Sequence, residues 1–267
     1  MNILLENLLK IENQALSTCK SLDQIAGEIL TIEDSKLDRK LKKVIFKQNG
    51  FRYSKSCLNF FDFLKQKRGD CVNFSLLYHL LLGTLDFESE IIAVPSHTIV
   101  KVKEKGKEYL IETTDGSIEE PNFYIKDRKI HQNSISNGIY LTALTANQIL
   151  SIYLNRKVRV LLEDKAYLAS LNILRDAYSY CENIPELCYN LGYVYNQIGH
   201  SKKAKNFFER AIELHPNFAQ SYNGLGICYA RERNFEMAEA CFRKSLSLEY
   251  SEHIKTNLDK HFSMKCK

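Results

Sequence analysis

The chain has 267 residues, a length of one to two domains, and its 37 basic side chains against 32 acidic ones give a formal net charge of +5. Apolar residues make up 45% of it and prolines number only four, which excludes a disordered or collagen-like chain. The charge excess is small and dispersed, so it gives no electrostatic reason to expect binding to nucleic acid.

No apolar run reaches the length of about eighteen residues that spans a bilayer. We therefore expect neither a membrane anchor nor a secretory signal. The cysteines show no CxxC spacing, and the chain is far longer than scaffolds held together by disulfides, so we expect reduced thiols and a cytoplasmic protein. These cysteines are Cys19, Cys57, Cys71, Cys181, Cys188, Cys228, Cys241 and Cys266.

Residues 1 to 48 have the apolar spacing that is typical of helices. Gly27 is the only glycine before Gly50, so little in this segment opposes helix formation. The sequence therefore predicts a helical cover for the domain that follows. The recurring apolar positions are Leu4, Leu5, Leu8, Leu9, Ile11, Ile25, Ile29, Leu41, Val44 and Ile45.

An apolar helix is predicted from Val72 to Leu82, after an aromatic helix-like stretch from Leu58 to Lys65. Asp70 is the predicted N-cap, and Gly83 ends the helix. Cys71 then stands in the first turn, where exposed amides and the helix dipole favour the thiolate, the nucleophilic form of cysteine.

Three strands are predicted next, over residues 89–94, 97–103 and 107–113, with a tight hairpin at Gly106. His97 opens the second strand. A cysteine nucleophile needs an imidazole that takes the thiol proton and passes it to a leaving group, and an acid that holds the imidazole's tautomer. A carboxylate on the neighbouring strand suits that role.

Glu112 and Asp115 compete for the role of this acid, and the hairpin register separates them. A two-residue loop at 105–106 pairs position 97 with position 114, which puts Glu112 on the face of His97. A three-residue loop at 104–106 pairs position 97 with position 113 and favours Asp115. We favour Glu112 and keep Asp115 as the alternate acid.

The segments RGDCVNFSLLYHLLL, PSHTIVKV and YLIETTDG together resemble the transglutaminase-like superfamily, which is related to papain-type cysteine enzymes. The resemblance covers roughly residues 50–120 and implies acyl chemistry through a thioester, in a peptidase, amidase or transamidase. It implies that Cys71 is the nucleophile, His97 the base and Glu112 its orienting acid. Backbone amides near Cys71 are expected to stabilise the oxyanion.

The sequence departs from the family pattern at two places. Glu112-Thr113-Thr114 replaces the usual aspartate, and Thr98-Ile99 replaces the aromatic residue that commonly follows the histidine. The alternative interpretation is therefore a scaffold that keeps the transglutaminase-like fold without catalysis and acts through protein interactions.

A capping box at Thr145 and Gln148 predicts the start of a helix that runs to about Glu163. We place the domain boundary just before it. Residues 1–143 are then the transglutaminase-like domain with its helical cover, and residues 144–267 a repeat domain.

The repeat domain is indicated by a period of 34 residues. The pattern resembles the tetratricopeptide repeat, with units at 185–218 and 219–252 and a degenerate unit near 151–184. Because stacked repeats usually number about three or more, we expect the array to lean on another domain. The matching residues are Leu191, Gly192, Tyr195, Ala204 and Phe208 in one unit and Leu225, Gly226, Tyr229, Ala238 and Phe242 in the next.

The repeat resemblance implies a concave groove lined by Tyr189, Tyr193, Asn196, Asn223 and Ile227, with aromatic and amide groups that suit an extended peptide. The expected partner is therefore a protein or peptide. An open alternative is that the chain's own domain covers the groove. More narrowly, bacterial transglutaminase-like proteins carry such repeats in the same order.

The sequence therefore predicts an α+β chain: helices on a small antiparallel sheet, followed by an all-α tetratricopeptide solenoid. No cofactor is expected, because the eleven glycines form no phosphate-binding loop and no GxSxG elbow is present. No metal site is expected either, because the histidines are scattered without ligand spacing.

Overall fold

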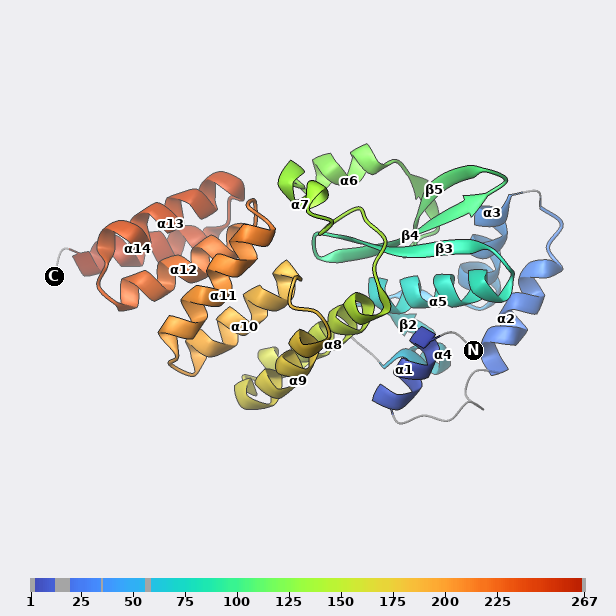
Figure 1. The fold of residues 1–267 in the computed structure, drawn as a ribbon, viewed down its shortest axis with the longest axis horizontal. Helices are drawn as coiled ribbons and strands as arrows, with labels where there is room; N and C mark the ends of the chain where they lie inside the picture. The colour runs from blue at the N-terminus through green and yellow to red at the C-terminus, as the bar shows by residue number, and fades with distance from the viewer. Residues whose placement is uncertain (1–2, 13–19, 35, 56–58, 266–267) are drawn as a thin grey trace. The chain divides into compact units, whose positions relative to one another are not determined.

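The computed structural model describes residues 3–12, 20–34, 36–55 and 59–265. The chain forms two compact units, residues 1–128 with 140–157, and residues 129–139 with 158–267. The chain therefore passes from the first unit to the second and back before the repeats begin (Figure 1). The expected α+β class with a repeat tail is confirmed.

The first unit begins with the predicted helical cover. Helix α1 spans Ile3–Ile11, α2 spans Lys20–Leu30, and α3 (Leu37–Lys42) continues as a π-helix, η2 (Lys43–Gln48). The apolar positions that predicted these helices and are described as buried are Leu4, Leu8, Leu9, Ile25, Ile29, Leu41, Val44 and Ile45. The periodicity was therefore a sound guide to the face that each helix buries.

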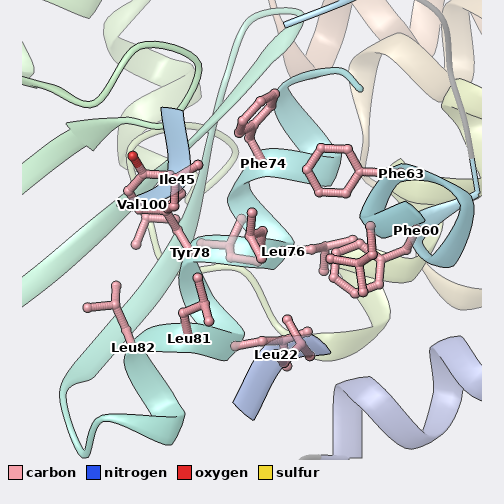
Figure 2. Packing of buried hydrophobic residues seen from close by; sticks show 14 of the residues in the cluster. Leu22, Ile45, Phe60, Phe63, Phe74, Leu76, Tyr78, Leu81, Leu82 and Val100 are labelled. Atoms are coloured by element: carbon pink, nitrogen blue, oxygen red, sulfur yellow. The ribbon is translucent and has the colours of Figure 1, made fainter. Parts of the chain in front are cut away.

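Helix α5 (Cys71–Thr84) is the centre of the first unit, and it is apolar on all sides. A helix with that composition must be buried all round, and α5 contacts α2 as well as strands β3 and β4. Helix α4 (Phe60–Gln66) packs beside it. Figure 2 shows the rings of Phe63 and Phe74 beside each other. Their centroids are 5.2 Å apart, and their planes meet at 66°, an edge-to-face arrangement.

The sheet has four antiparallel strands in the order β3 (Glu88–Val94), β4 (His97–Glu104), β5 (Lys107–Glu112) and β6 (Ser117–Glu119). The first three are the predicted strands, whereas β6 was not predicted. Two-residue segments β1 (Arg52–Tyr53) and β2 (Arg68–Gly69) form a separate parallel pair.

The β4–β5 hairpin closes with the two-residue loop that favours Glu112. Glu104 pairs with Lys107, and both loop residues have positive φ, 50° at Lys105 and 77° at Gly106. Two positive φ values are the mark of a type I′ turn, whose twist matches that of the strands. The observed pairing runs from Glu104–Lys107 to Val100–Ile111, which is the register of the two-residue loop.

Helix α8 (Ala146–Glu163) begins at the predicted capping box. The Thr145 hydroxyl accepts the Gln148 amide at 3.3 Å, and the Gln148 side chain accepts the Thr145 amide at 2.8 Å. The first part of α8 buries Leu150 and Tyr153 in the core of the first unit. The boundary predicted between residues 143 and 144 therefore does not coincide with the division of the chain, because a cap marks where a helix starts and not which core it joins.

The second unit consists mainly of antiparallel helix pairs. Its helices are α9 (Tyr167–Tyr180), α10 (Pro185–Gln197), α11 (Ser201–Leu214), α12 (Ala219–Arg231), α13 (Phe235–Leu248) and α14 (Glu252–Lys265). A Cβ atom at Gly192 would lie 2.8 Å from Phe208, and one at Gly226 would lie 2.8 Å from Phe242. Glycine at these positions therefore lets the two helices of each repeat approach closely.

A short segment from before α8 also belongs to the second unit. Helix α6 (Pro121–Asp127) belongs to the first unit, and the next helix, α7 (Gln132–Ser136), belongs to the second. The Ser134 hydroxyl donates to the Leu214 carbonyl at 2.9 Å, and the Lys129 ammonium donates to the Leu248 carbonyl at 2.9 Å. The two carbonyls occupy equivalent positions of successive repeats, so this segment binds the same edge of both.

Candidate active site

Cys71 is the first residue of α5, and Asp70 is its N-cap, as predicted. One carboxylate oxygen of Asp70, Oδ1, accepts the amides of Val72 at 3.0 Å and Asn73 at 3.2 Å. The Asn73 side chain accepts the Asp70 amide in return, which completes a capping box. A Cβ atom on Gly69 would lie 2.5 Å from Phe63, so only glycine fits before this cap.

His97 and Glu112 lie at the ends of adjacent strands, His97 at the start of β4 and Glu112 at the end of β5. Nε2 of His97 lies 2.7 Å from Oε2 of Glu112. Asp115 is exposed and accepts the amide of Ser117 at 2.7 Å. Of the two candidate acids, Glu112 is therefore the one that contacts the imidazole.

The Glu112 carboxylate is held on both of its oxygens. Thr114 donates to Oε1 from its amide at 3.1 Å and from its hydroxyl at 2.6 Å. The hydroxyl of buried Tyr124 in α6 donates to Oε2 at 3.2 Å. Burial alone would raise the pKa of Glu112, but His97 and the two bonds from Thr114 lower it. A longer acid than the usual aspartate is thus fixed in place by its neighbours.

Arg156 in α8 brings a positive charge to the same place. Its Nη1 donates to the Cys71 sulfur at 2.7 Å, and its Nη2 lies 2.7 Å from Oδ2 of Asp70. The side chain of Asp70 is 1% exposed, so Arg156 forms an ion pair with a buried carboxylate. The Tyr153 hydroxyl, one turn earlier in α8, accepts the Phe60 amide at 2.9 Å and anchors this part of the helix.

The Cys71 thiol and the His97 imidazole interact and shift each other's protonation. Burial alone would raise the pKa of Cys71, but the hydrogen bond with His97 and the charge of Arg156 lower it to about 7. Burial would lower the pKa of His97, but Cys71 and Glu112 raise it to about 9. Both shifts favour the thiolate form of Cys71 and the imidazolium form of His97.

A buried hydroxyl cluster lies directly behind these residues. Ser75 Oγ, one turn after Cys71, donates to Oγ1 of Thr98 at 3.1 Å and lies 3.2 Å from Oγ1 of Thr113. Thr98 follows His97 in β4, and Thr113 follows Glu112. The departures from the family pattern at these threonines therefore have a structural role, because the hydroxyls tie α5 to both strands.

The sulfur itself is not open to solvent. Cys71 is 2% exposed, whereas the side chains of His97, Glu112 and Arg156 are 11%, 15% and 21% exposed. Arg156 is thus the most exposed of these four side chains, and it contacts the sulfur. A reagent or substrate that reaches Cys71 must displace a covering side chain.

The two tyrosines predicted for the repeat groove are partly buried in aromatic contacts of the second unit. The ring centroid of Tyr189 lies 5.9 Å from that of Phe208 and 5.4 Å from that of Phe218. Tyr193 lies 6.4 Å from Tyr167 in α9. A peptide bound there would meet rings that are already ordered by their neighbours.

The two groove asparagines have partners within the chain. Arg231 Nη1 donates to the Oδ1 of Asn196 at 2.7 Å and to its backbone carbonyl at 2.9 Å. Asn257 in α14 donates to Asn223 Oδ1 at 3.0 Å. Asn196 is buried, and Ile227 is partly exposed. A peptide amide would have to compete with these bonds, so the groove roles of all five residues stay predictions.

Sequence reasoning missed three residues of the site. Thr114 had a signal, because it follows Glu112 by two residues at a strand end, where side chains commonly bond back to the chain. Tyr124 and Arg156 had none, since only packing brings α6 and α8 to the site. The described cysteines are free thiols, whereas Cys19, Cys57 and Cys266 lie outside the described residues, as does Leu58.

Within the described ranges, no cluster of three histidine, cysteine or acidic side chains is arranged to hold a metal ion. In the same part of the chain, every helix is too short or too polar to cross a membrane.

Comparison with known protein families gives matches in both parts of the chain. A family model described as the transglutaminase-like superfamily matches residues 16–160. Two models described as the tetratricopeptide repeat match residues 185–218 and 207–240. The first match extends into α8 and includes Arg156 as well as Cys71, His97 and Glu112.

Curated relatives share only a segment of the chain. The uncharacterised protein ycf37 of Porphyra purpurea is 38% identical over 79 residues, which are 30% of this chain and 45% of that protein. The ycf37 protein of Pyropia yezoensis is 34% identical over 77 residues, 29% of this chain and 43% of that protein. The chain therefore spans less than half the length of these relatives.

Solved structures with similarity to the chain include isolated tetratricopeptide domains. The Sgt2 domain from Aspergillus fumigatus aligns with a TM-score of 0.41 at 20% identity, over 43% of this chain and 78% of that one. The Arabidopsis OM64 domain aligns with a TM-score of 0.42 at 16% identity, over 44% of this chain and 98% of that one.

Proposed function

Because the chain belongs to the transglutaminase-like superfamily, we propose that it is a thiol-dependent acyl-transfer enzyme with Cys71 as nucleophile, His97 as acid and base, and Glu112 as the residue that orients His97. The observation that carries the proposal is the joining of these three side chains, with Nε2 of His97 2.7 Å from Glu112 and the pKa of Cys71 lowered to about 7. Where burial dominates, the pKa of a thiol is raised instead, as that of Cys188 is, to about 12.

The proposed reaction starts from the thiolate of Cys71 and the imidazolium of His97. The Cys71 thiolate attacks the carbonyl carbon of an amide, a C–S bond forms, and the carbonyl electron pair moves to oxygen. As the tetrahedral intermediate collapses, the C–N bond breaks and the amine leaves with a proton from the His97 imidazolium. Water or a second amine then gives a proton to His97 and attacks the thioester, which releases the thiolate.

Glu112 has two tasks in this scheme. Its contact with Nε2 leaves the other ring nitrogen, Nδ1, for the sulfur and for the leaving group. Its charge also stabilises the imidazolium while the thiolate waits for a substrate. The bonds from Thr114 and Tyr124 keep the carboxylate from turning away.

The tetratricopeptide tail is proposed to bind an extended segment of a protein partner and so bring the enzyme to its substrate. The free state of the described cysteines supports a reducing compartment, and we propose the cytoplasm.

The test is capture of the acyl-enzyme with an activated ester, p-nitrophenyl acetate. We expect mass spectrometry to find an acetyl group on Cys71, removable by hydroxylamine, with Cys71→Ser unlabelled. Glu112→Gln should slow acylation by about tenfold or more because the imidazolium loses its partner. Asp115→Asn is the matched control, since Asp115 does not contact His97, and its rate should match the wild type.

One observation favours a second candidate, a binding protein without catalysis. The Cys71 sulfur is covered, with 2% of the residue exposed. If the ester leaves Cys71 unmodified while the protein is folded, the scaffold is the better interpretation. A faster reaction in Asp115→Asn than in Glu112→Gln, by contrast, supports the enzyme.

A further inference from the structure

Acyl transfer at Cys71 requires donors for the oxygen that becomes negative when the thiolate attacks. The first-turn amides of a helix are the usual source, and they were the expectation from sequence. In this chain the amides of Val72 and Asn73 already donate to Oδ1 of Asp70. These two amides are engaged in capping the helix, so they are not available to the oxyanion.

The guanidinium of Arg156 has the position and the positive charge that such a donor needs. Its Nη1 lies 2.7 Å from the Cys71 sulfur, and its Nη2 is held 2.7 Å from Asp70 Oδ2. The charge of Asp70 thereby attracts one side of the guanidinium while Nη1 on the other side lies against the reacting atom. A carbonyl oxygen is only one bond from the carbon that the sulfur attacks, so a small shift of Nη1 brings it to that oxygen.

The change of charge during the reaction fits this position. At rest the negative charge is on sulfur, where Arg156 contributes to lowering the pKa of Cys71. On attack the sulfur becomes neutral, and the charge moves to the substrate oxygen a few ångströms away. The side chain of Arg156 is also 21% exposed, so a part of it is open to solvent.

We propose that Arg156 is a catalytic residue, with its guanidinium on the Cys71 thiolate in the resting enzyme and on the oxyanion during acyl transfer. The inference rests on the proposed function and adds to it a charged donor from α8. It also gives the buried Asp70 a second task, which is to orient Arg156 as well as to cap α5.

Two reactions of the same thiol separate the two tasks of Arg156. In acylation by p-nitrophenyl acetate, the thiolate forms a C–S bond, the carbonyl pair moves to oxygen, and collapse releases p-nitrophenolate with the C–O electron pair. In alkylation by iodoacetamide, the thiolate displaces iodide in one step and no oxyanion forms. The ratio of the two rates, each measured with the thiolate fully formed, therefore separates stabilisation of the oxyanion from the nucleophilicity of the thiolate.

Arg156→Lys and Arg156→Gln are the test variants. We expect the ratio of acylation to alkylation to fall about 10- to 100-fold in both variants. The ammonium of Arg156→Lys, paired with Asp70, lacks the second donor of the guanidinium fork, and the side chain of Arg156→Gln carries no positive charge. We expect the midpoint of the alkylation pH profile to rise in Arg156→Gln and to stay near the wild-type value in Arg156→Lys. Arg159→Gln, on an exposed residue of the same helix, should keep the wild-type ratio.

The outcomes separate this inference from the proposed function. An unchanged ratio in both Arg156 variants overturns the oxyanion role and leaves Cys71 as a nucleophile. A wild-type protein that is alkylated at Cys71 but never acylated overturns the proposed function and the oxyanion role together. Because Arg156→Gln leaves the buried Asp70 without a cation and destabilises the fold, Arg156→Lys, with its circular dichroism checked, decides the question.

Discussion

At the scale of single residues, the chain treats its buried cysteines in two different ways. Burial is the largest influence on the thiols in the repeats, and it raises the pKa of Cys228 and of Cys241 to about 11. Cys71 is as deeply buried, but an imidazole and a guanidinium reverse the direction of the shift. Burial therefore does not make a thiol inert when opposite charges are buried with it.

This contrast predicts that Cys71 is modified in preference to the buried cysteines of the repeats. Since only the thiolate reacts, the rate of alkylation at Cys71 should rise as the pH increases through about 7 and then level off. His97→Ala removes a hydrogen bond and a charge that favour the thiolate, so its midpoint should move to higher pH. Peptide mass mapping after iodoacetamide treatment at several pH values checks both. A midpoint near 8.5 that His97→Ala leaves unchanged contradicts the ion pair.

At the scale of elements, close helix pairing in the repeats depends on glycines with no room for a side chain. Gly192 faces Phe208 and Gly226 faces Phe242, at positions one repeat apart. The same rings fill the space that a methyl group would need. Glycine therefore recurs one repeat apart because the paired helices pack closely at that position. The size of the phenylalanine ring sets the distance between the two helices.

Substitution of one such glycine tests this requirement. Gly226→Ala places a Cβ atom 2.8 Å from the Phe242 ring and should destabilise the chain by about 1–3 kcal/mol through overpacking. Gly83→Ala, in helix α5, meets nothing within 4 Å and should be neutral or stabilising by up to about 1 kcal/mol. Urea unfolding of both variants measures the difference. Equal effects would show that helix propensity, not packing, dominates at Gly226.

At the scale of the whole molecule, sequence order and structural grouping differ. Residues 129–139 belong to the repeat unit, although they precede residues 140–157 of the first unit. Ser134 and Lys129 bond to carbonyls of two successive repeats, and Ile139 packs on a cluster that includes Leu214. The repeats that are visible in the sequence number fewer than three, and a segment from outside them packs on their helices.

A fragment of residues 145–267 should therefore unfold with poor cooperativity. It lacks Lys129, Ser134 and Ile139, so two carbonyls and an apolar surface of the repeats lose their partners. Thermal melting followed by circular dichroism should give a broad transition at lower temperature than in the full chain. A longer fragment that begins at residue 129 should recover part of the cooperativity. A sharp transition in the short fragment contradicts this account.

The sequence by itself determined the parts of this protein that depend on local physics. Three features depend on residues that are close together in the sequence. They are the N-cap at Asp70, the two-residue turn at Lys105–Gly106 and the helix pair of each 34-residue repeat. The register of the hairpin also followed from that turn, so the contact of Glu112 with His97 was predictable.

Only the tertiary structure decided what lies around the sulfur. Arg156 reaches Cys71 from 85 residues away because α8 buries Tyr153 and Leu150 in the first core, and no local pattern records that packing. The same is true of Tyr124 on Glu112 and of the hydroxyls behind the site. Local rules act through neighbouring backbone groups, whereas a site assembled from distant helices depends on which apolar faces find each other.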